Sequence, residues 1–154
     1  MAKERDQAIK DIATYRKAFY RYHVEDRLEA GIVLTGTEVK SLRAGKAVLN
    51  DAYAIFDGTE LFLLNLHIEE YLQGNRFNHD PLRKRKLLLH QSELRKIRGK
   101  IQERGYSMVP LRLYFKGAYV KVELGLVKGK QQFDKRESIK KRDQLRDSAR
   151  QFKR

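Results

Sequence analysis

The residues best suited to chemistry are basic side chains interleaved with aromatic ones. Three stretches have this composition, at residues 15–22, 83–90 and 128–136. Lysine and arginine neutralise phosphates, and aromatic rings offer faces on which unpaired bases stack. The pattern therefore predicts RNA binding. DNA is a weaker candidate because no recognition helix with its own turn is apparent.

The run Arg-Lys-Arg-Lys at residues 83–86 is the sharpest part of this pattern. Four adjacent cations repel one another, and in the sequence alone they contribute nothing evident to folding. We therefore interpret the run as a site for a polyanion. For Tyr22 and Phe115, in contrast, a place in the core is the preferred interpretation.

One short pattern suggests catalysis. Glu38 and Lys40 have the acid-x-Lys spacing of metal-dependent nucleases, and Asp26 or Glu29 could help to hold a divalent metal over a phosphate. The competing interpretation is structural, because Thr35 and Glu38 have the spacing of a helix capping box. We favour the structural interpretation.

The chain lacks the residue patterns of other common catalytic and metal sites. The chain has no cysteine, and its four histidines show no metal-ligand spacing. Residues 125–131 resemble a phosphate-binding loop but lack its glycine spacing and its Ser or Thr. We therefore expect no enzymatic activity, no metal and no cofactor.

Composition points to a polyanionic partner. The 154 residues include 34 Lys and Arg against 20 Asp and Glu, a net charge of +14. Hydrophobic residues make up 41%, enough for one compact domain. No apolar run approaches the roughly 20 residues of a membrane span, and no signal peptide is evident. We expect a cytoplasmic protein that does not associate with membranes.

The charge divides the chain into a body and a tail. Residues 128–154 hold 11 basic and 4 acidic residues, a net +7 that equals the net charge of all residues before them. With few apolar residues, this tail should be mobile alone, yet its charge pairs at helical spacing favour a helix on an acidic surface. We predict a body over 15–127. It is preceded by an N-terminal segment over 1–14, for which the sequence leaves both a flexible and an ordered state open.

Strands should dominate the body. A long curved strand is expected over 20–34, with a bend or bulge at 29–31, and hairpins over 52–66 and 108–127. Their turns are predicted at Asp57-Gly58 and near Lys116-Gly117.

Helices should interrupt the strands. One is predicted over 36–44, ended by Gly45, and another from Asp80-Pro81 to just before Gly105. The fold class is thus mainly β (α+β), an OB-like closed antiparallel barrel with about three flanking helices.

Four motifs, at residues 29–43, 80–90, 109–115 and 128–136, occur in this order. Together they closely resemble the small protein B family, the SsrA-binding proteins of bacteria. The resemblance covers nearly the whole chain from about Arg16 onward.

The family resemblance implies a non-enzymatic, OB-like adaptor that binds the tRNA-like domain of transfer-messenger RNA. It carries this RNA, alanylated and with elongation factor Tu, to stalled ribosomes for trans-translation. The tail is expected to enter the empty mRNA channel near the decoding centre of 16S rRNA and to become helical there. We expect a monomer. A ribosomal or assembly protein bound to rRNA is the alternative function.

The resemblance also implies site residues. Glu29, Leu88 and Lys121 match positions associated with RNA binding, and Gly129 matches the flexible joint before the tail. With the basic and aromatic candidates added, the expected RNA-binding set is Arg16, Lys17, Tyr20, Glu29, Lys40, Arg43, Arg83, Arg85, Lys86, Leu88 and Lys121. The expected ribosome-binding set is Lys128, Gly129, Lys130, Phe133, Asp134, Lys135 and Arg136.

Two positions depart from the family pattern. Tyr15 stands where the family usually has Asn, which removes the amide, and stacking by the tyrosine ring is the alternative contact. Gln131 replaces the second Lys of the usual Gly-Lys-Lys, which removes one cation from the tail.

Overall fold

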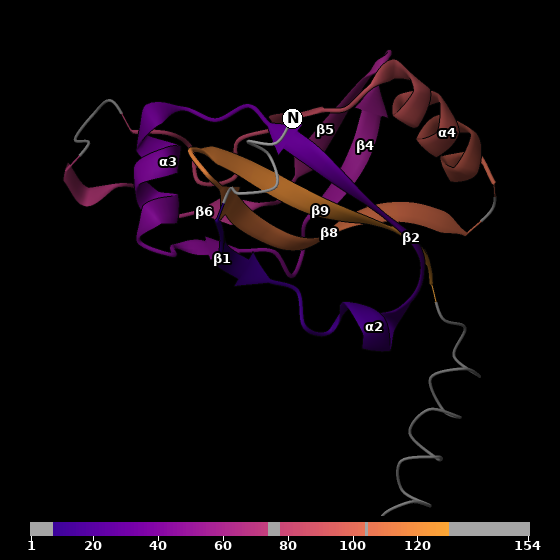
Figure 1. The fold of residues 1–154 in the computed structure, drawn as a ribbon, viewed down its shortest axis with the longest axis horizontal. Helices are drawn as coiled ribbons and strands as arrows, with labels where there is room; N and C mark the ends of the chain where they lie inside the picture. Colours follow the sequence, from indigo (N-terminus) through magenta and orange to yellow (C-terminus); the bar gives the residue numbers. More distant parts are fainter. Residues whose placement is uncertain (1–7, 74–77, 104, 130–154) are drawn as a thin grey trace, which may run out of the picture.

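The computed structural model describes residues 8–73, 78–103 and 105–129, and within them the fold is mainly β with three helices (Figure 1). The strands are β1 (Ile9–Thr14), β2 (Tyr22–Ile32), β3 (Ala47–Val48), β4 (Tyr53–Asp57), β5 (Glu60–Leu64), β6 (His67–Ile68), β7 (Arg85–Leu88), β8 (Tyr106–Lys116) and β9 (Tyr119–Gly129). The helices are α2 (Ala18–Arg21), α3 (Gly36–Arg43) and α4 (Gln91–Ile101). Figure 1 shows α3 and α4 at opposite ends of the strands.

Six strands form a ring of antiparallel pairings. The sheet order is β1-β8-β4-β5-β7-β2-β9, and β9 also pairs with β8. Two junctions of the ring are short: β4 meets β8 only at Ala54 and Met108, and β2 meets β7 only at two residue pairs. The long ladders β2–β9 and β8–β9 therefore carry most of the sheet, and β7 pairs mainly with β5, at three of its four residues.

The core lies inside this ring. Alternate side chains along a strand point to opposite faces, so Leu61 and Leu63 of β5 point inward and are fully buried. Leu113 and Leu124, from β8 and β9, are also fully buried.

The predicted hairpins are confirmed. β4–β5 turns after Asp57 and β8–β9 turns after Lys116, with positive φ at Gly58 and Gly117. The predicted long strand is also present as β2, but its bulge lies between Val24 and Asp26 and not at 29–31. Residues 29–31 instead keep regular pairing with β9.

Of the two predicted helices, the first is confirmed and the second begins later than expected. In α3 the Thr35 N–H donates to Glu38 Oε1 at 2.8 Å, as the capping-box spacing indicated. The helix predicted from Pro81 starts only at Gln91, because Asp80 closes a turn and residues 85–88 form β7. Leu87 is buried and Leu88 exposed, an alternation typical of a strand.

A strand lies within the predicted N-terminal segment. Residues 9–14 form β1, which pairs with β8. Tyr15 follows with only 3% of its surface exposed, and its hydroxyl accepts a hydrogen bond from Arg21 Nη1 at 3.2 Å. The alternative that Tyr15 stacks on RNA is therefore excluded, because its ring is part of the core. The boundaries at 14 and 127 stay predictions as domain limits.

A buried ion pair joins α3 to β7. The fully buried Glu38 accepts from the Nε of the fully buried Arg85, and Arg83 Nη2 reaches its other oxygen at 2.7 Å. The remaining Arg85 donors reach the carbonyl oxygens of Leu66 at 2.6 Å and Pro81 at 3.2 Å. Each nitrogen of the Arg85 guanidinium and each oxygen of Glu38 thus has a hydrogen-bond partner, as a buried charge requires.

The same network sets the charge of Glu38. Burial raises the pKa of the Glu38 carboxyl, but hydrogen bonds from Arg83 and the Thr35 N–H, with the charge of Arg85, outweigh it and hold the pKa below its ordinary 4.5. Because the pKa of Glu38 is lower in the folded state, its ionised carboxylate stabilises the fold. This contribution is complete above the ordinary carboxyl range and is lost as the pH falls through the lowered pKa.

The interpretation that residues 83–86 contribute nothing to folding is wrong. Beyond the pairing of Arg83 and Arg85 with Glu38, Lys84 Nζ lies 2.7 Å from an Asp57 oxygen and Lys86 Nζ lies 3.3 Å from a Glu60 oxygen. Partner carboxylates on distant segments relieve the repulsion that the sequence suggested.

We predict that Glu38→Gln lowers the free energy of unfolding by about 3–5 kcal/mol, because it leaves Arg85 charged and buried without its anion. Urea unfolding measures the change. Glu60→Gln is the control, because the Lys86–Glu60 pair is exposed and its loss should cost less than about 1 kcal/mol. Equal losses for the two variants would contradict the prediction.

Candidate RNA interface

Three strands bring together the family-implied residues in one groove. Glu29 comes from β2, Leu88 from β7 and Lys121 from β9, and all three line a cavity of about 420 Å³. The rest of the lining comes from Gly31, Leu89, His90 and Glu93.

Strand register explains this convergence. Gly31 of β2 lies opposite Leu88 of β7 on one side and opposite Lys121 of β9 on the other. A Cβ at Gly31 would lie 3.2 Å from the Leu88 Cβ, closer than most such contacts. Glycine therefore keeps the groove floor open between Leu88 and Lys121.

Glu29 is held in place as a carboxylate. One oxygen accepts from the Tyr114 hydroxyl, and the other lies 3.2 Å from Lys116 Nζ. Burial raises the pKa of Glu29, but these hydrogen bonds and the nearby positive charges outweigh it and lower the pKa below its usual value. For Tyr114, burial and the hydrogen bond to Glu29 raise the pKa of the phenol.

The groove offers three complementary contacts for a nucleotide. The fixed carboxylate of Glu29 can accept hydrogen bonds from base amino groups. The side chain of Leu88, 50% exposed on the outer face of β7, can pack against an unstacked base. The ammonium of Lys121 can meet a phosphate.

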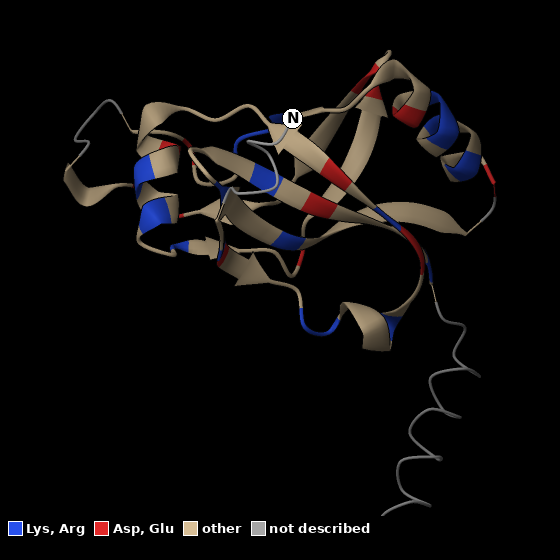
Figure 2. Ribbon diagram, viewed as in Figure 1, with Lys and Arg blue, Asp and Glu red and all other residues tan. Residues whose placement is uncertain are grey.

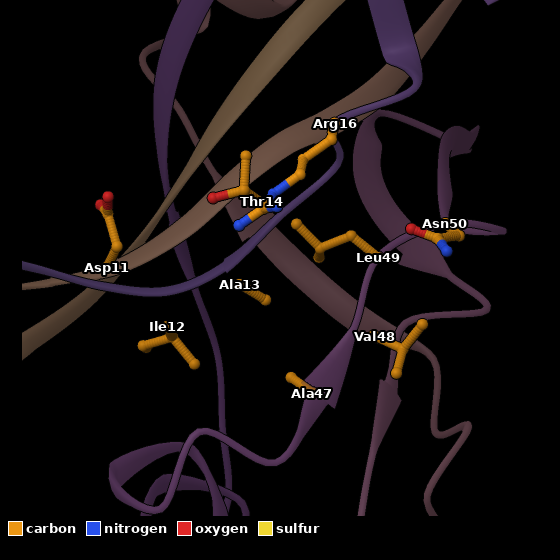
Figure 3. A pocket seen from close by; sticks show the side chains of 9 residues that line it. All are labelled: Asp11, Ile12, Ala13, Thr14, Arg16, Ala47, Val48, Leu49 and Asn50. Carbon is orange, nitrogen blue, oxygen red and sulfur yellow. The ribbon is translucent and has the colours of Figure 1, made fainter.

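The other predicted RNA-binding residues lie outside the groove lining. Arg16 lines a second pocket of about 330 Å³ with residues from the end of β1 and from β3 (Figure 3). Lys17 precedes α2, and Tyr20 lies exposed on it.

The two basic residues of α3 occupy a further part of the surface. Lys40 Nζ lies 5.5 Å from the centroid of the Tyr71 ring, and Arg43 lines a pocket with Lys10 and Phe115. Figure 2 shows basic residues on α3, on α4 and around α2, and both signs of charge on β2 and β9. The basic residues are therefore spread over several elements of the fold.

Arg85 is removed from the RNA-contacting set, because its side chain is fully buried against Glu38. Arg83 and Lys86 keep partly exposed side chains, at 33% and 42%. The core interpretation of Tyr22 and Phe115 is confirmed, since both are partly buried and pack against the core cluster.

The nuclease hypothesis is contradicted by the position of Glu38. Both oxygens of this fully buried carboxylate are occupied by arginines and a backbone N–H, so they are unavailable to a metal. In the described part of the chain, no group of three His, Cys, Asp or Glu residues could hold a metal ion. Within the same residues, no helix is long and apolar enough to cross a membrane.

The tail begins beside α2. Gly129, the last residue of β9, pairs with Tyr22, which directly follows α2. β9 thus continues two residues past Val127, and Lys128 Nζ lies 5.5 Å from the Tyr106 ring. The other predicted ribosome-binding residues, Lys130 and 133–136, lie outside the described residues.

Sequence reasoning missed several parts of the groove. The Glu93 carboxylate accepts from the His90 N–H at 3.3 Å at the start of α4, and this capping spacing could have located the helix. Nothing local marks Tyr114 or Gly31, because their roles depend on pairing with distant strands.

The chain is similar to known proteins in sequence and in fold. The family model described as SmpB protein matches residues 12–154. The chain is 62% identical to the SsrA-binding protein of Geobacter metallireducens over 90% of each chain, and 54% identical to that of Acetivibrio thermocellus over 99% of this chain and 97% of the other. A solved structure described as "tmRNA-SmpB: a journey to the center of the bacterial ribosome" is similar with a TM-score of 0.68 and 47% identity, over 82% of this chain and 93% of that chain.

We predict that Tyr114→Phe raises the pKa of Glu29 toward its ordinary value, because the carboxylate loses a hydrogen-bond donor. NMR titration of the Glu29 side-chain carboxyl carbon measures this change. Tyr106→Phe is the matched control, since the Tyr106 hydroxyl donates to Glu25 at 2.7 Å on the same strand as Glu29. An unchanged Glu29 titration in Tyr114→Phe would contradict the assignment.

Proposed function

Because this chain belongs to the SmpB protein family, we propose that it is an adaptor that binds the tRNA-like domain of transfer-messenger RNA and delivers it to stalled ribosomes. The observation that carries the proposal is the groove formed by Glu29, Leu88 and Lys121. Residues 92 positions apart in the sequence converge there with a hydrogen-bond acceptor, an apolar surface and a cation. These are the contacts that an unstacked nucleotide requires.

The adaptor role explains why candidate RNA-binding residues lie both in the groove and around α2. The groove would hold the RNA, while Arg16, Lys17 and Tyr20 around α2 would extend the contact toward the point where the tail leaves the body. We infer that the tail enters the empty mRNA channel of the ribosome, near the decoding centre of 16S rRNA. Elongation factor Tu joins the complex through the alanylated RNA.

Several finer features belong to the same proposal. We infer that the ring of strands is an OB-like closed barrel, that the body spans 15–127, and that the protein acts as a monomer in the cytoplasm. The proposed role is non-enzymatic, since recognition requires no bond to be made or broken by the protein.

We predict that groove substitutions weaken binding to the tRNA-like domain in two different ways. Lys121→Gln should weaken all RNA binding and reduce the salt slope of log Kd by about one, because one phosphate contact is lost. Glu29→Gln and Leu88→Ala should reduce discrimination against an elongator tRNA with little change in salt slope, because they contact bases. Fluorescence titration at several salt concentrations measures both effects.

Lys100→Gln provides the control for the loss of one exposed cation. Lys100 lies on α4 beside Glu103, at 3.8 Å, and outside the groove. Lys100→Gln should leave the affinity for the tRNA-like domain unchanged. If Lys121→Gln and Lys100→Gln behave alike, the groove is not the RNA site.

We predict that replacing Asp134, Lys135 and Arg136 together leaves binding to the tRNA-like domain intact but abolishes peptide tagging on stalled ribosomes. The body would still hold the RNA, while the tail would lose its rRNA phosphate contacts. RNA titration and an in vitro tagging assay measure the two properties. Loss of RNA binding would instead make the tail a general electrostatic anchor.

A further inference from the structure

The outer face of the β4–β5 hairpin carries a row of apolar side chains that are partly exposed to solvent. Tyr53 lies opposite Leu64, and Ile55 lies opposite Phe62. Tyr53 and Ile55 are 39% and 37% exposed, whereas the intervening Ala54 points inward and is buried. We call these four residues, Tyr53, Ile55, Phe62 and Leu64, the outer strip.

The outer strip is continuous with the groove through β7. Phe62 lies opposite Lys86, which is two residues from Leu88 on the same strand. Residues two apart point to the same face about 7 Å from each other. Val33, 44% exposed, follows β2 and donates its N–H to the Lys86 carbonyl at 2.9 Å, so it borders both regions.

Two lysines lie on the outer strip with replaceable partners. Lys84 Nζ is 4.2 Å from the centroid of the Phe62 ring and 2.7 Å from an Asp57 oxygen, and Lys86 pairs with Glu60. All four charged side chains in these pairs are at least 42% exposed, and exposed ion pairs contribute little stability. A phosphate can therefore replace Asp57 as the partner of Lys84, which would free the Phe62 ring face.

We propose that the outer strip is a second contact for the RNA bound in the groove, where an unpaired base stacks on Phe62 and its phosphates meet Lys84 and Lys86. The proposal rests on the proposed function. RNA is favoured over a protein partner because the strip extends an RNA groove without interruption. An aromatic ring beside exposed ammonium groups is also the usual platform for single-stranded nucleic acid.

The test compares Phe62→Leu with Phe56→Leu in titrations against the tRNA-like domain. Phe56 is a matched control, because it lies on the same hairpin under another cation, Arg98 at 4.8 Å, but lines a pocket against α4. Phe62→Leu should weaken binding roughly tenfold through lost stacking, whereas Phe56→Leu should leave it unchanged. Phe62→Tyr, which keeps the ring, should restore the affinity.

A second pair of variants tests the proposal without changing Phe62, so a folding defect in Phe62→Leu cannot affect its result. Lys84→Gln should reduce the salt slope of log Kd by about one, while Lys96→Gln, which removes an exposed cation from α4, should not. Unchanged slopes for both variants would overturn the proposal.

The outcomes separate this inference from the proposed function. If the unsubstituted chain does not bind the RNA specifically, the proposed function itself fails. If it does, and Phe62→Leu binds equally well, only the outer strip loses its assigned ligand. Unchanged RNA affinity with a loss of peptide tagging would assign the strip to a protein partner and overturn the RNA contact.

Discussion

The ion pair between Glu38 and Arg85 determines which face of β7 meets solvent. β7 has only four residues, which pair at three positions with β5 and at two with β2, and the anchoring of Arg85 inside the ring reinforces this register. With Arg85 and Leu87 pointing inward, strand alternation directs Lys86 and Leu88 outward. A shift of one residue would exchange these faces. The exposure of Leu88 in the groove and of Lys86 beside the outer strip is therefore reinforced by a buried charge pair on the opposite face of β7.

The groove follows from strand pairing once β7 is fixed. Gly31 lies between Leu88 and Lys121 in the ladder, and its missing side chain leaves the space that a nucleotide would enter. Glu29, two residues earlier on the same face of β2, is held as an anion by Tyr114 and Lys116. Recognition groups thus lie on rigid strands whose side chains are already oriented, which lowers the entropy lost on binding.

Local sequence signals predicted the two hairpins and α3, because Asp57-Gly58, Lys116-Gly117 and the Thr35–Glu38 box act within a few residues. The family resemblance supplied Glu29, Leu88 and Lys121, but no periodicity indicated that they meet. The error at residues 83–90 has the same origin. The alternating burial on β7 and the carboxylate partners of the four cations at residues 83–86 both depend on segments distant in the chain. A run of charges does not reveal which of its members is inside.

Specific recognition of the tRNA-like domain is the central claim, and competition binding tests it most directly. The purified chain would be titrated with the isolated tRNA-like domain of transfer-messenger RNA at near-physiological salt, with an ordinary elongator tRNA as competitor, so that non-specific phosphate contacts are weakened. Tight binding that resists the competitor is the predicted result. Equal affinity for both RNAs would contradict the claim, and would favour a general basic surface bound to rRNA.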